Sequence, residues 1–249
     1  MSRDSETVIN VINPNMTVTM TELIAKAAQA SASPHTRIVG RTARFGAASI
    51  EGHYDEAIAA VGMLKEVEAG DAEGCHAHVI ACFGDPGLLA ARELSAVPVL
   101  GIAEAAMHAA SFVATHFSIV TTLSRTKVIA EHLARNYGME QHCRKVRAVD
   151  VAVLDLDKPE ANVRGTLLGE CEAALREDGI GAIVLGCAGM ADLAAELARE
   201  HGLPVIDGVA AAVTLAESLV RLGLKTSRLG PYATPRSKTY SGPFSQFQP

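Results

Sequence analysis

The run HVIAC at His78–Cys82 and the run IVLGC at Ile183–Cys187 follow one pattern, an apolar segment that ends at a cysteine. The two cysteines lie 105 positions apart. A short apolar run of this length, bounded by turn-forming residues, is typical of a strand buried within a parallel sheet. The repetition therefore predicts two equivalent strands, one in each half of the chain, that each end at a thiol.

Two further pairs of segments repeat in the same order. VPVLG at Val97–Gly101 matches LPVID at Leu203–Asp207, and VINPN at Val11–Asn15 matches IVTTL at Ile119–Leu123. The offsets are 106 and 108 positions, close to the 105 of the cysteine pair. Any two strand–helix units share some likeness, but three segments at nearly one offset indicate an internal duplication.

Apolar strand-like runs alternate with helical patterns along the whole chain. One such helical stretch is Glu160–Glu177. Strands that alternate with helices predict an α/β fold whose sheets are parallel. The runs that we expect to form strands are Val8–Ile12, Thr36–Arg41, His78–Cys82, Val97–Gly101, Phe117–Thr121, Lys145–Val149, Ala182–Cys187 and Pro204–Ile206.

The duplication predicts two similar α/β domains related by a pseudo-twofold axis. We expect residues 1–101 plus 207–249 to form the first domain and residues 102–206 to form the second. Open α/β sheets bind their ligands at the carboxyl ends of the strands. The two cysteines should therefore face each other across an active site at the interface of the domains.

The composition narrows the choice of partner. The 249 residues carry a formal net charge of −6 and contain no Lys/Arg-rich run, so we expect neither nucleic acid nor membrane as a partner. No apolar stretch is long enough to span a bilayer, and the polar N-terminus lacks the apolar core of a signal peptide. Five widely spaced cysteines indicate free thiols in a reducing compartment. We therefore expect a cytoplasmic protein that binds a small molecule.

The residues after Cys82 resemble a helix start. Asp85 is a good N-cap and Pro86 suits the first helical position. Backbone N–H groups and the positive end of a helix dipole beside a thiol lower its pKa. Small residues after Cys187 would let a substrate approach the backbone. Both cysteines are thus predicted to be reactive, whereas Cys75, Cys143 and Cys171 are interpreted as structural, the common fate of a lone cysteine.

One thiolate and one thiol on opposite faces of a bound carbon acid make a two-base racemase: one sulfur removes the proton and the other delivers a proton to the opposite face. The intermediate is an enolate, whose charge needs hydrogen-bond donors. We expect these donors to be the backbone amides of Phe83, Gly84, Ala188 and Gly189. The chain contains no GxGxxG motif after a strand, no phosphate-binding GxxxxGK[ST] motif and no HExxH motif, so we expect neither a cofactor nor a metal.

At these residues the sequence resembles the Asp/Glu/hydantoin racemase superfamily, and within it the hydantoin racemase and allantoin racemase branch. The resemblance extends from Val8 to Ser227. It implies catalysis by Cys82 and Cys187 without a cofactor, substrate binding by Asn13, Thr121 and Thr122, and a homo-oligomer. The matching stretches are INPN at Ile12–Asn15, SIEGHYDEA at Ser49–Ala57, ACFGDPG at Ala81–Gly87, IVTT at Ile119–Thr122, VLGCAGM at Val184–Met190 and VIDGV at Val205–Val209.

The residues after the two cysteines differ from those of the amino-acid racemases in this superfamily, and the difference indicates the substrate. Amino-acid racemases of this superfamily follow the first cysteine with Asn-Thr and the second with Thr-His, which grip a carboxylate. Here Phe83-Gly84 and Ala188-Gly189 stand in those places. Bare backbone donors suit a neutral planar ring with two carbonyls, so we expect a racemase of 5-substituted hydantoins, including allantoin (5-ureidohydantoin). Phe45, Ile50 and Phe83 are the candidates for the pocket around the 5-substituent.

Several alternatives remain open at this stage. Maleate isomerases of the superfamily also use two cysteines, and amino-acid racemisation is a further possibility. A two-lobed binding protein without catalysis is the alternative from another class. His53-Tyr54-Asp55-Glu56 is interpreted as a solvated first turn of a helix, although Glu51 or His53 could border the cleft. The preference between allantoin and 5-alkyl or 5-aryl hydantoins, the oligomer number and the enantiomer on which each cysteine acts are not decided by the sequence.

Overall fold

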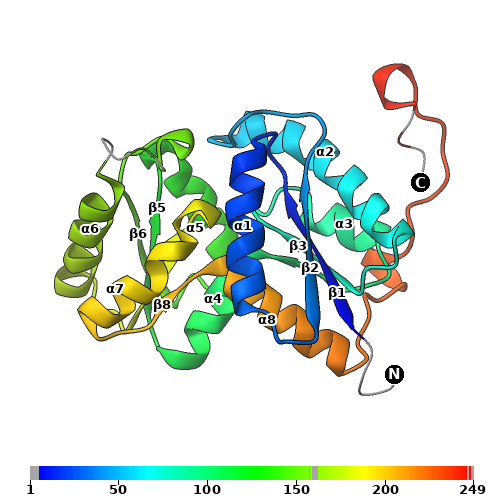
Figure 1. Ribbon diagram of the computed structural model, residues 1–249. Helices are drawn as coiled ribbons and strands as arrows, with labels where there is room; N and C mark the ends of the chain where they lie inside the picture. The colour runs from blue at the N-terminus through cyan, green and yellow to red at the C-terminus, as the bar shows by residue number, and fades with distance from the viewer. Residues whose placement is uncertain (1–5, 157, 159–161, 246, 248–249) are drawn as a thin grey trace.

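The structure is a computed structural model that describes residues 6–156, 158, 162–245 and 247. These residues form two four-stranded parallel sheets with helices packed around them (Figure 1). The first sheet has the order β2-β1-β3-β4, and the second has the order β6-β5-β7-β8. The strands are β1 (Thr7–Asn13), β2 (Thr36–Thr42), β3 (Ala77–Ile80), β4 (Val99–Gly101), β5 (Phe117–Thr121), β6 (Cys143–Ala148), β7 (Ala182–Gly186) and β8 (Val205–Ile206).

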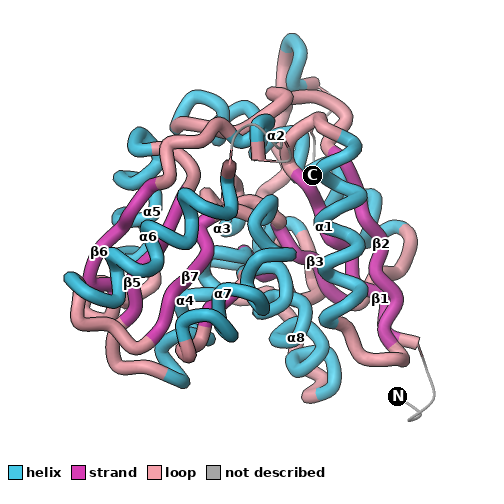
Figure 2. Tube along the Cα trace, turned by 60° about the vertical axis from the view of Figure 1, so that its left-hand side comes forward, coloured by secondary structure: helices cyan, strands magenta, loops and turns pink. Residues whose placement is uncertain are grey.

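The two sheets are copies of one topology, because adding four to each strand number of the first sheet gives the second. Figure 2 shows their strands as two separate groups with helices between and around them. The helices are α1 (Val18–Ser31), α2 (His53–Ala72), α3 (Leu88–Leu94), α4 (Ile102–Val113), α5 (Lys127–Asn136), α6 (Val163–Glu177), α7 (Ala194–His201) and α8 (Gly208–Arg221). The predicted α/β fold with two similar parallel-sheet halves is confirmed. Of the predicted helix Glu160–Glu177, residues 160 and 161 lie outside the described part of the chain.

The helices α4 and α8 each pack on the sheet opposite to the strand that precedes them. Helix α4 follows β4 of the first sheet but packs against β7 of the second, and α8 follows β8 but packs against β3 of the first. Ala106 and Met107 of α4 belong to the core of the second sheet, whereas Val209 and Val213 of α8 belong to the core of the first. The two helices also pack against each other. This exchange joins the halves through buried apolar surface.

The predicted start of the helix after Cys82 is wrong. Helix α3 begins at Leu88, and its N-cap is Gly87 with a φ of 71°. Asp85 itself has a φ of 44°, a left-handed conformation that Asp tolerates better than most residues. Its carboxylate does not cap α3 but accepts bonds from the first turn of α4. Asp85 is therefore a helix-capping residue, as predicted, but it caps α4 and not α3.

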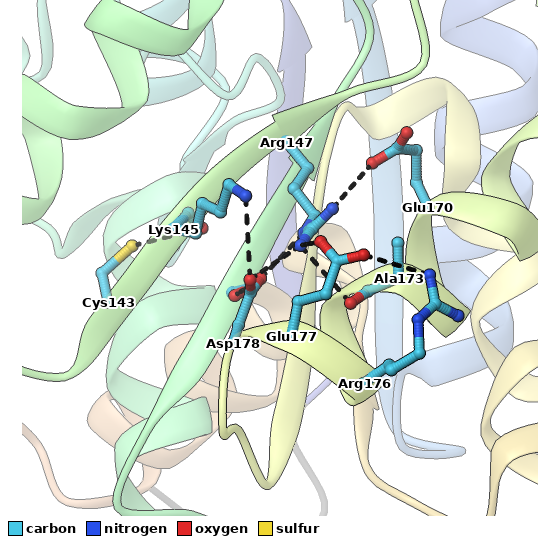
Figure 3. Close-up of polar contacts among 9 residues, drawn as sticks. Cys143, Lys145, Arg147, Glu170, Ala173, Arg176, Glu177 and Asp178 are labelled. Atoms are coloured by element: carbon cyan, nitrogen blue, oxygen red, sulfur yellow. Dashed lines mark hydrogen bonds and ion pairs between the residues drawn. The ribbon is translucent and has the colours of Figure 1, made fainter.

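A buried arginine ties the edge strand β6 to the end of α6 (Figure 3). Arg147 donates two hydrogen bonds to Asp178, at 2.8 Å from Nε and 2.7 Å from a terminal nitrogen. It also donates to Glu177 at 2.7 Å. Ser118 of β5 donates to the same Asp178 carboxylate at 2.7 Å. Burial alone would raise the pKa of Asp178, but the hydrogen bonds from Arg147 and Ser118 outweigh it and lower that pKa.

None of the helices within the described residues is both long and apolar enough to cross a membrane.

Replacing Arg147 with alanine should destabilise the fold by about 3 kcal/mol, because the buried Asp178 carboxylate loses its two hydrogen bonds from Arg147 and keeps only Lys145 Nζ, at 4.0 Å, as a charged partner. The matched control is Arg164→Ala, since Arg164 pairs with Glu196 and Glu200 at a site that is half exposed. That change should cost at most about 1 kcal/mol. Urea unfolding followed by circular dichroism measures both. Equal losses in the two variants would contradict the assignment of the Arg147 cluster as a buried support.

Candidate active site

A cavity lies between the carboxyl ends of the two sheets, and both halves of the chain line it. Chain segments that follow β1, β3, β5 and β7 contribute to its wall. The lining residues are Asn15, Met20, Ile50, Gly52, Glu56, Ala81, Cys82, Phe83, Gly84, Thr121, Thr122, Thr126, Ile129, Ala130, Val153, Gly186, Cys187 and Ala188. Carboxyl ends of parallel strands are where open α/β sheets place their ligands. The position of the cavity therefore agrees with the expectation from the repeat.

Cys82 and Cys187 are both half-buried and both line this cavity, one from each half. Cys82 lies two residues beyond the end of β3, and Cys187 directly follows β7. Six further residues that the sequence singled out also line it: Ile50, Phe83, Gly84, Thr121, Thr122 and Ala188. The Thr121 hydroxyl donates to the carbonyl of Gly186 at 3.3 Å, which braces the backbone just before Cys187.

Asn13 does not line the cavity, although substrate binding was expected of it. Its side-chain amide donates to Asn15 Oδ1 at 2.8 Å, to the Thr17 carbonyl at 3.1 Å and to Thr21 Oγ1 at 3.0 Å. The side chain is 1% exposed. Asn13 therefore orients Asn15, and it is Asn15 that borders the cavity. A sequence cannot distinguish the two asparagines, because the difference lies in which way each amide turns.

Phe45 and Gly189 are likewise outside the cavity wall. Phe45 is partly exposed, and its ring makes an edge-to-face contact with Phe247 at 6.0 Å between centroids. Gly189 adjoins the site instead of lining it: a Cβ atom at this position would lie 3.7 Å from the sulfur of Cys187 and 2.8 Å from Leu156 Cδ1. The expected role of Phe45 around a 5-substituent therefore finds no support in its position, whereas Ile50 and Phe83 border the cavity.

Glu56 is a cavity residue that the sequence interpretation missed. Its neighbours His53 and Tyr54 are exposed, as a solvated first turn predicts, but the Glu56 side chain is only 17% exposed and lines the cavity. A Cβ atom at position 84 would collide with the Glu56 carboxylate, so Gly84 gives the Glu56 side chain room in its present orientation. Burial raises the pKa of Glu56, and the 3.3 Å contact with His53 partly opposes that rise. The only signal in the sequence was the acidic residue at a helix start.

Burial raises the pKa of the Cys82 thiol well above its ordinary value. A hydrogen bond from the backbone N–H of Gly84 acts in the opposite direction, while the nearby Cys187 and Glu56 raise the pKa further. The expectation that a helix start lowers the pKa of Cys82 is therefore wrong. The physical reason is that α3 begins only at Leu88, so desolvation is not offset by a helix dipole at the sulfur.

Among the described residues, no three His, Cys, Asp or Glu side chains are grouped so that they could hold a metal ion.

Two similar α/β halves, each contributing a cysteine to one cavity, define a class of enzymes that bind a small molecule between two parallel-sheet lobes. The chain belongs to the Asp/Glu/hydantoin racemase family, whose sequence pattern matches residues 9–216. This finding confirms the family and the isomerase class that the sequence predicted.

Individual relatives are similar over nearly their whole length. A hydantoin racemase from Pseudomonas sp. (strain NS671) is 47% identical over 240 residues, which is 96% of each chain. The structure of an allantoin racemase from Klebsiella pneumoniae is 56% identical and superposes with a TM-score of 0.95, covering 98% of this chain and 100% of that one. An allantoin racemase from Pseudomonas fluorescens is 44% identical, with a TM-score of 0.91 and coverage of 95% and 100%.

The raised pKa of Cys82 predicts slow alkylation of the ligand-free protein near neutral pH. Because only the thiolate reacts, the rate at Cys82 should keep rising with pH through about 8.5, the ordinary pKa of a thiol. Iodoacetamide labelling followed by mass spectrometry of the Cys82 peptide measures this, with free glutathione in parallel as the unshifted reference. A rate at Cys82 that is already level at pH 7 would mean that the thiolate is stabilised before substrate binds.

Proposed function

We propose that this protein is a cofactor-independent racemase of 5-substituted hydantoins, including allantoin, and that Cys82 and Cys187 are its two acid–base residues. The observation that carries the proposal is the meeting of both cysteines in one cavity from equivalent positions of the two halves. Family membership and the similarity to hydantoin and allantoin racemases support it.

In the proposed reaction, the thiolate of one cysteine takes the hydrogen at C5 as a proton and becomes a thiol. The electron pair of the broken C–H bond moves toward the C4 carbonyl and forms an enolate. The thiol of the other cysteine then gives its proton to the opposite face of C5 and becomes a thiolate. The product is the other enantiomer, and the two sulfurs have exchanged protonation states, so the site is ready for the reverse direction.

Burial raises the pKa of Cys82, which fits this scheme if the reaction starts with Cys82 protonated. Cys82 would then begin as the thiol, the proton donor, and Cys187 as the base. The Gly84 N–H that now bonds to the Cys82 sulfur can support the thiolate that Cys82 becomes after it has given up its proton. The other proposed enolate donors, the amides of Phe83, Ala188 and Gly189, belong to the same two loops.

The chemistry of the cavity wall favours a neutral ring over an amino acid. Phe83 and Ala188 stand where the resembling amino-acid racemases carry polar side chains that bind a carboxylate. The Glu56 carboxylate adds a negative group beside Cys82. An α-carboxylate in this cavity would be repelled by Glu56, whereas the ring N–H groups of a hydantoin are hydrogen-bond donors that a carboxylate accepts. Ile50 and Phe83 are proposed to contact the 5-substituent, the part in which allantoin differs from other hydantoins.

We also propose that residues 1–101 plus 207–249 form one domain and residues 102–206 the other. The packing of α4 on the second sheet and α8 on the first supports this division. A homo-oligomer working in the cytoplasm is proposed as well. Exposed apolar side chains near the ends of α4 and α8, namely Phe112, Val113, Leu222 and Leu224, support a contact between copies, and the free cysteines suit a reducing compartment.

The direct test of the function is circular dichroism of enantiopure allantoin and enantiopure 5-benzylhydantoin, each with and without the protein. The expected result is loss of the signal well above a no-protein blank, with no added cofactor or metal and with the ring intact. The faster substrate identifies the preferred 5-substituent. If folded, reduced protein accelerates neither reaction, the proposal fails. Activity on maleate or on aspartate and glutamate would then support the isomerase alternatives, and binding without turnover would support a binding protein.

Replacing Cys82 or Cys187 with serine should reduce racemisation in both directions by at least about 10³-fold, because a serine hydroxyl is a poor acid and base near neutral pH. In D₂O, each variant should still exchange the C5 hydrogen of one enantiomer through its remaining cysteine, and the two variants should act on opposite enantiomers. The matched control is Cys143→Ser, since Cys143 lies in β6 outside the cavity. Racemisation at the unmodified rate by either cavity variant would refute the two-base assignment.

A further inference from the structure

The loop that follows Cys82 is bonded to the start of α4 by a side chain. Asp85 Oδ1 accepts from the N–H of Ala103 at 3.1 Å, and Oδ2 accepts from the N–H of Glu104 at 3.0 Å. Asp85 is 5% exposed, and its own N–H donates to the carbonyl of Cys82 at 2.9 Å. The carboxylate therefore connects the backbone of the cysteine loop to a helix that packs on the opposite sheet.

The duplication shows what is unusual about this bond. At the equivalent helix α8, the N-cap residue Asp207 accepts from the N–H groups of Val209 and Ala210. Helix α4 has Gly101 at its N-cap, and no side chain fits there, because a Cβ atom would collide with the Asp85 carboxylate. In the first half, the N-terminus of α4 is thus capped by Asp85 of the Cys82 loop, whereas in the second half α8 is capped by its own N-cap residue, Asp207. A local aspartate would satisfy the helix equally well but would not hold that loop.

Tyr137 extends the link across the interface. It stands at the C-terminal end of α5, and its hydroxyl donates to Asp85 Oδ2 at 2.8 Å. Its ring packs against both the second-sheet core and the first-sheet core. Phe83, in the same loop as Asp85, is buried in the core of the second sheet. The Cys82 loop therefore departs from the first sheet but is held by groups that belong to the second.

The Cys187 loop has no counterpart of this link among its described residues. Met190 occupies the position equivalent to Asp85 and is fully buried in an apolar cluster. Ala188, the equivalent of Phe83, packs into the first-sheet core. Both loops thus reach into the opposite core, but a polar attachment through the side chain at this position exists only for Cys82.

We infer that Asp85 and Tyr137 are positioning residues that hold the Cys82 loop against the second half, and thereby set the placement of the Cys82 sulfur relative to Cys187. This inference rests on the proposed two-cysteine function. Proton transfer between two sulfurs and one carbon requires both sulfurs to be aligned with C5 at once, and a misplacement of about 1 Å can cost on the order of 100-fold in rate. Neither residue lines the cavity, so neither acts on the substrate directly.

Tyr137→Phe tests the link, because it removes the hydroxyl and keeps the ring that packs in both cores. The matched control is Ser118→Ala, which also removes one hydroxyl bonded to a buried carboxylate, at 2.7 Å from Asp178 and outside the cavity. The reaction is run in D₂O on each enantiomer of a hydantoin in turn, and mass spectrometry of the separated enantiomers gives two rates for each. One rate is inversion, and the other is exchange of the C5 hydrogen without inversion.

For the enantiomer from which Cys187 removes the proton, a displaced Cys82 should impair delivery of the second proton more than removal of the first. We expect Tyr137→Phe to lower the inversion rate by about tenfold, with KM little changed, and to raise the ratio of exchange to inversion severalfold. Ser118→Ala should keep the ratio of the unmodified protein, because a loss of folded molecules lowers both rates equally. Racemisation by the unmodified protein together with an unchanged ratio in Tyr137→Phe for both enantiomers would overturn this inference alone. No racemisation by the unmodified protein would overturn the proposed function and, with it, this inference.

Discussion

The packing of α4 and α8 against each other and against opposite sheets is the constraint on which the rest of the structure depends. Each helix leaves one sheet and buries its apolar face on the other, so separating the halves would expose the cores of both. A cavity that draws its wall from four strand ends in two sheets keeps its shape only if those sheets hold a constant relation. The exchanged helices supply that relation.

The duplication makes the two halves equivalent in topology but not in detail. Cys82 and Cys187 occupy corresponding places, and the residue after each packs into the opposite core, Phe83 in one case and Ala188 in the other. The polar attachment of the first loop through Asp85 has no copy at Met190. A reaction that runs in both directions needs matched sulfurs, but it does not need matched surroundings. The two loops can therefore differ in how firmly each is held.

Desolvation dominates the electrostatics of the site. It raises the pKa values of Cys82 and Glu56, and it raises that of Asp85 to about 7 despite hydrogen bonds from Glu104, Tyr137 and Ala103. For an aspartate, a folded pKa above the unfolded value means that ionisation opposes folding. The contribution of Asp85 to stability is thus fully present below about pH 4 and is lost as pH rises to about 7. The same burial strengthens the hydrogen bonds made to any charge that develops on a bound substrate.

The sequence by itself determined the α/β class, the duplication, the family and the two cysteines that meet in the cavity, because strand periodicity and repeated motifs are properties of the chain. It also marked Ile50, Thr121 and Thr122, which line the cavity. Only the tertiary structure decided that Asn15 and not Asn13 borders the cavity, that Glu56 turns inward and Phe45 outward, and that Asp85 caps α4 and not α3. Each of these outcomes depends on the direction of a side chain or on a partner distant in sequence. Local pattern cannot supply either, because both arise when the two halves pack together.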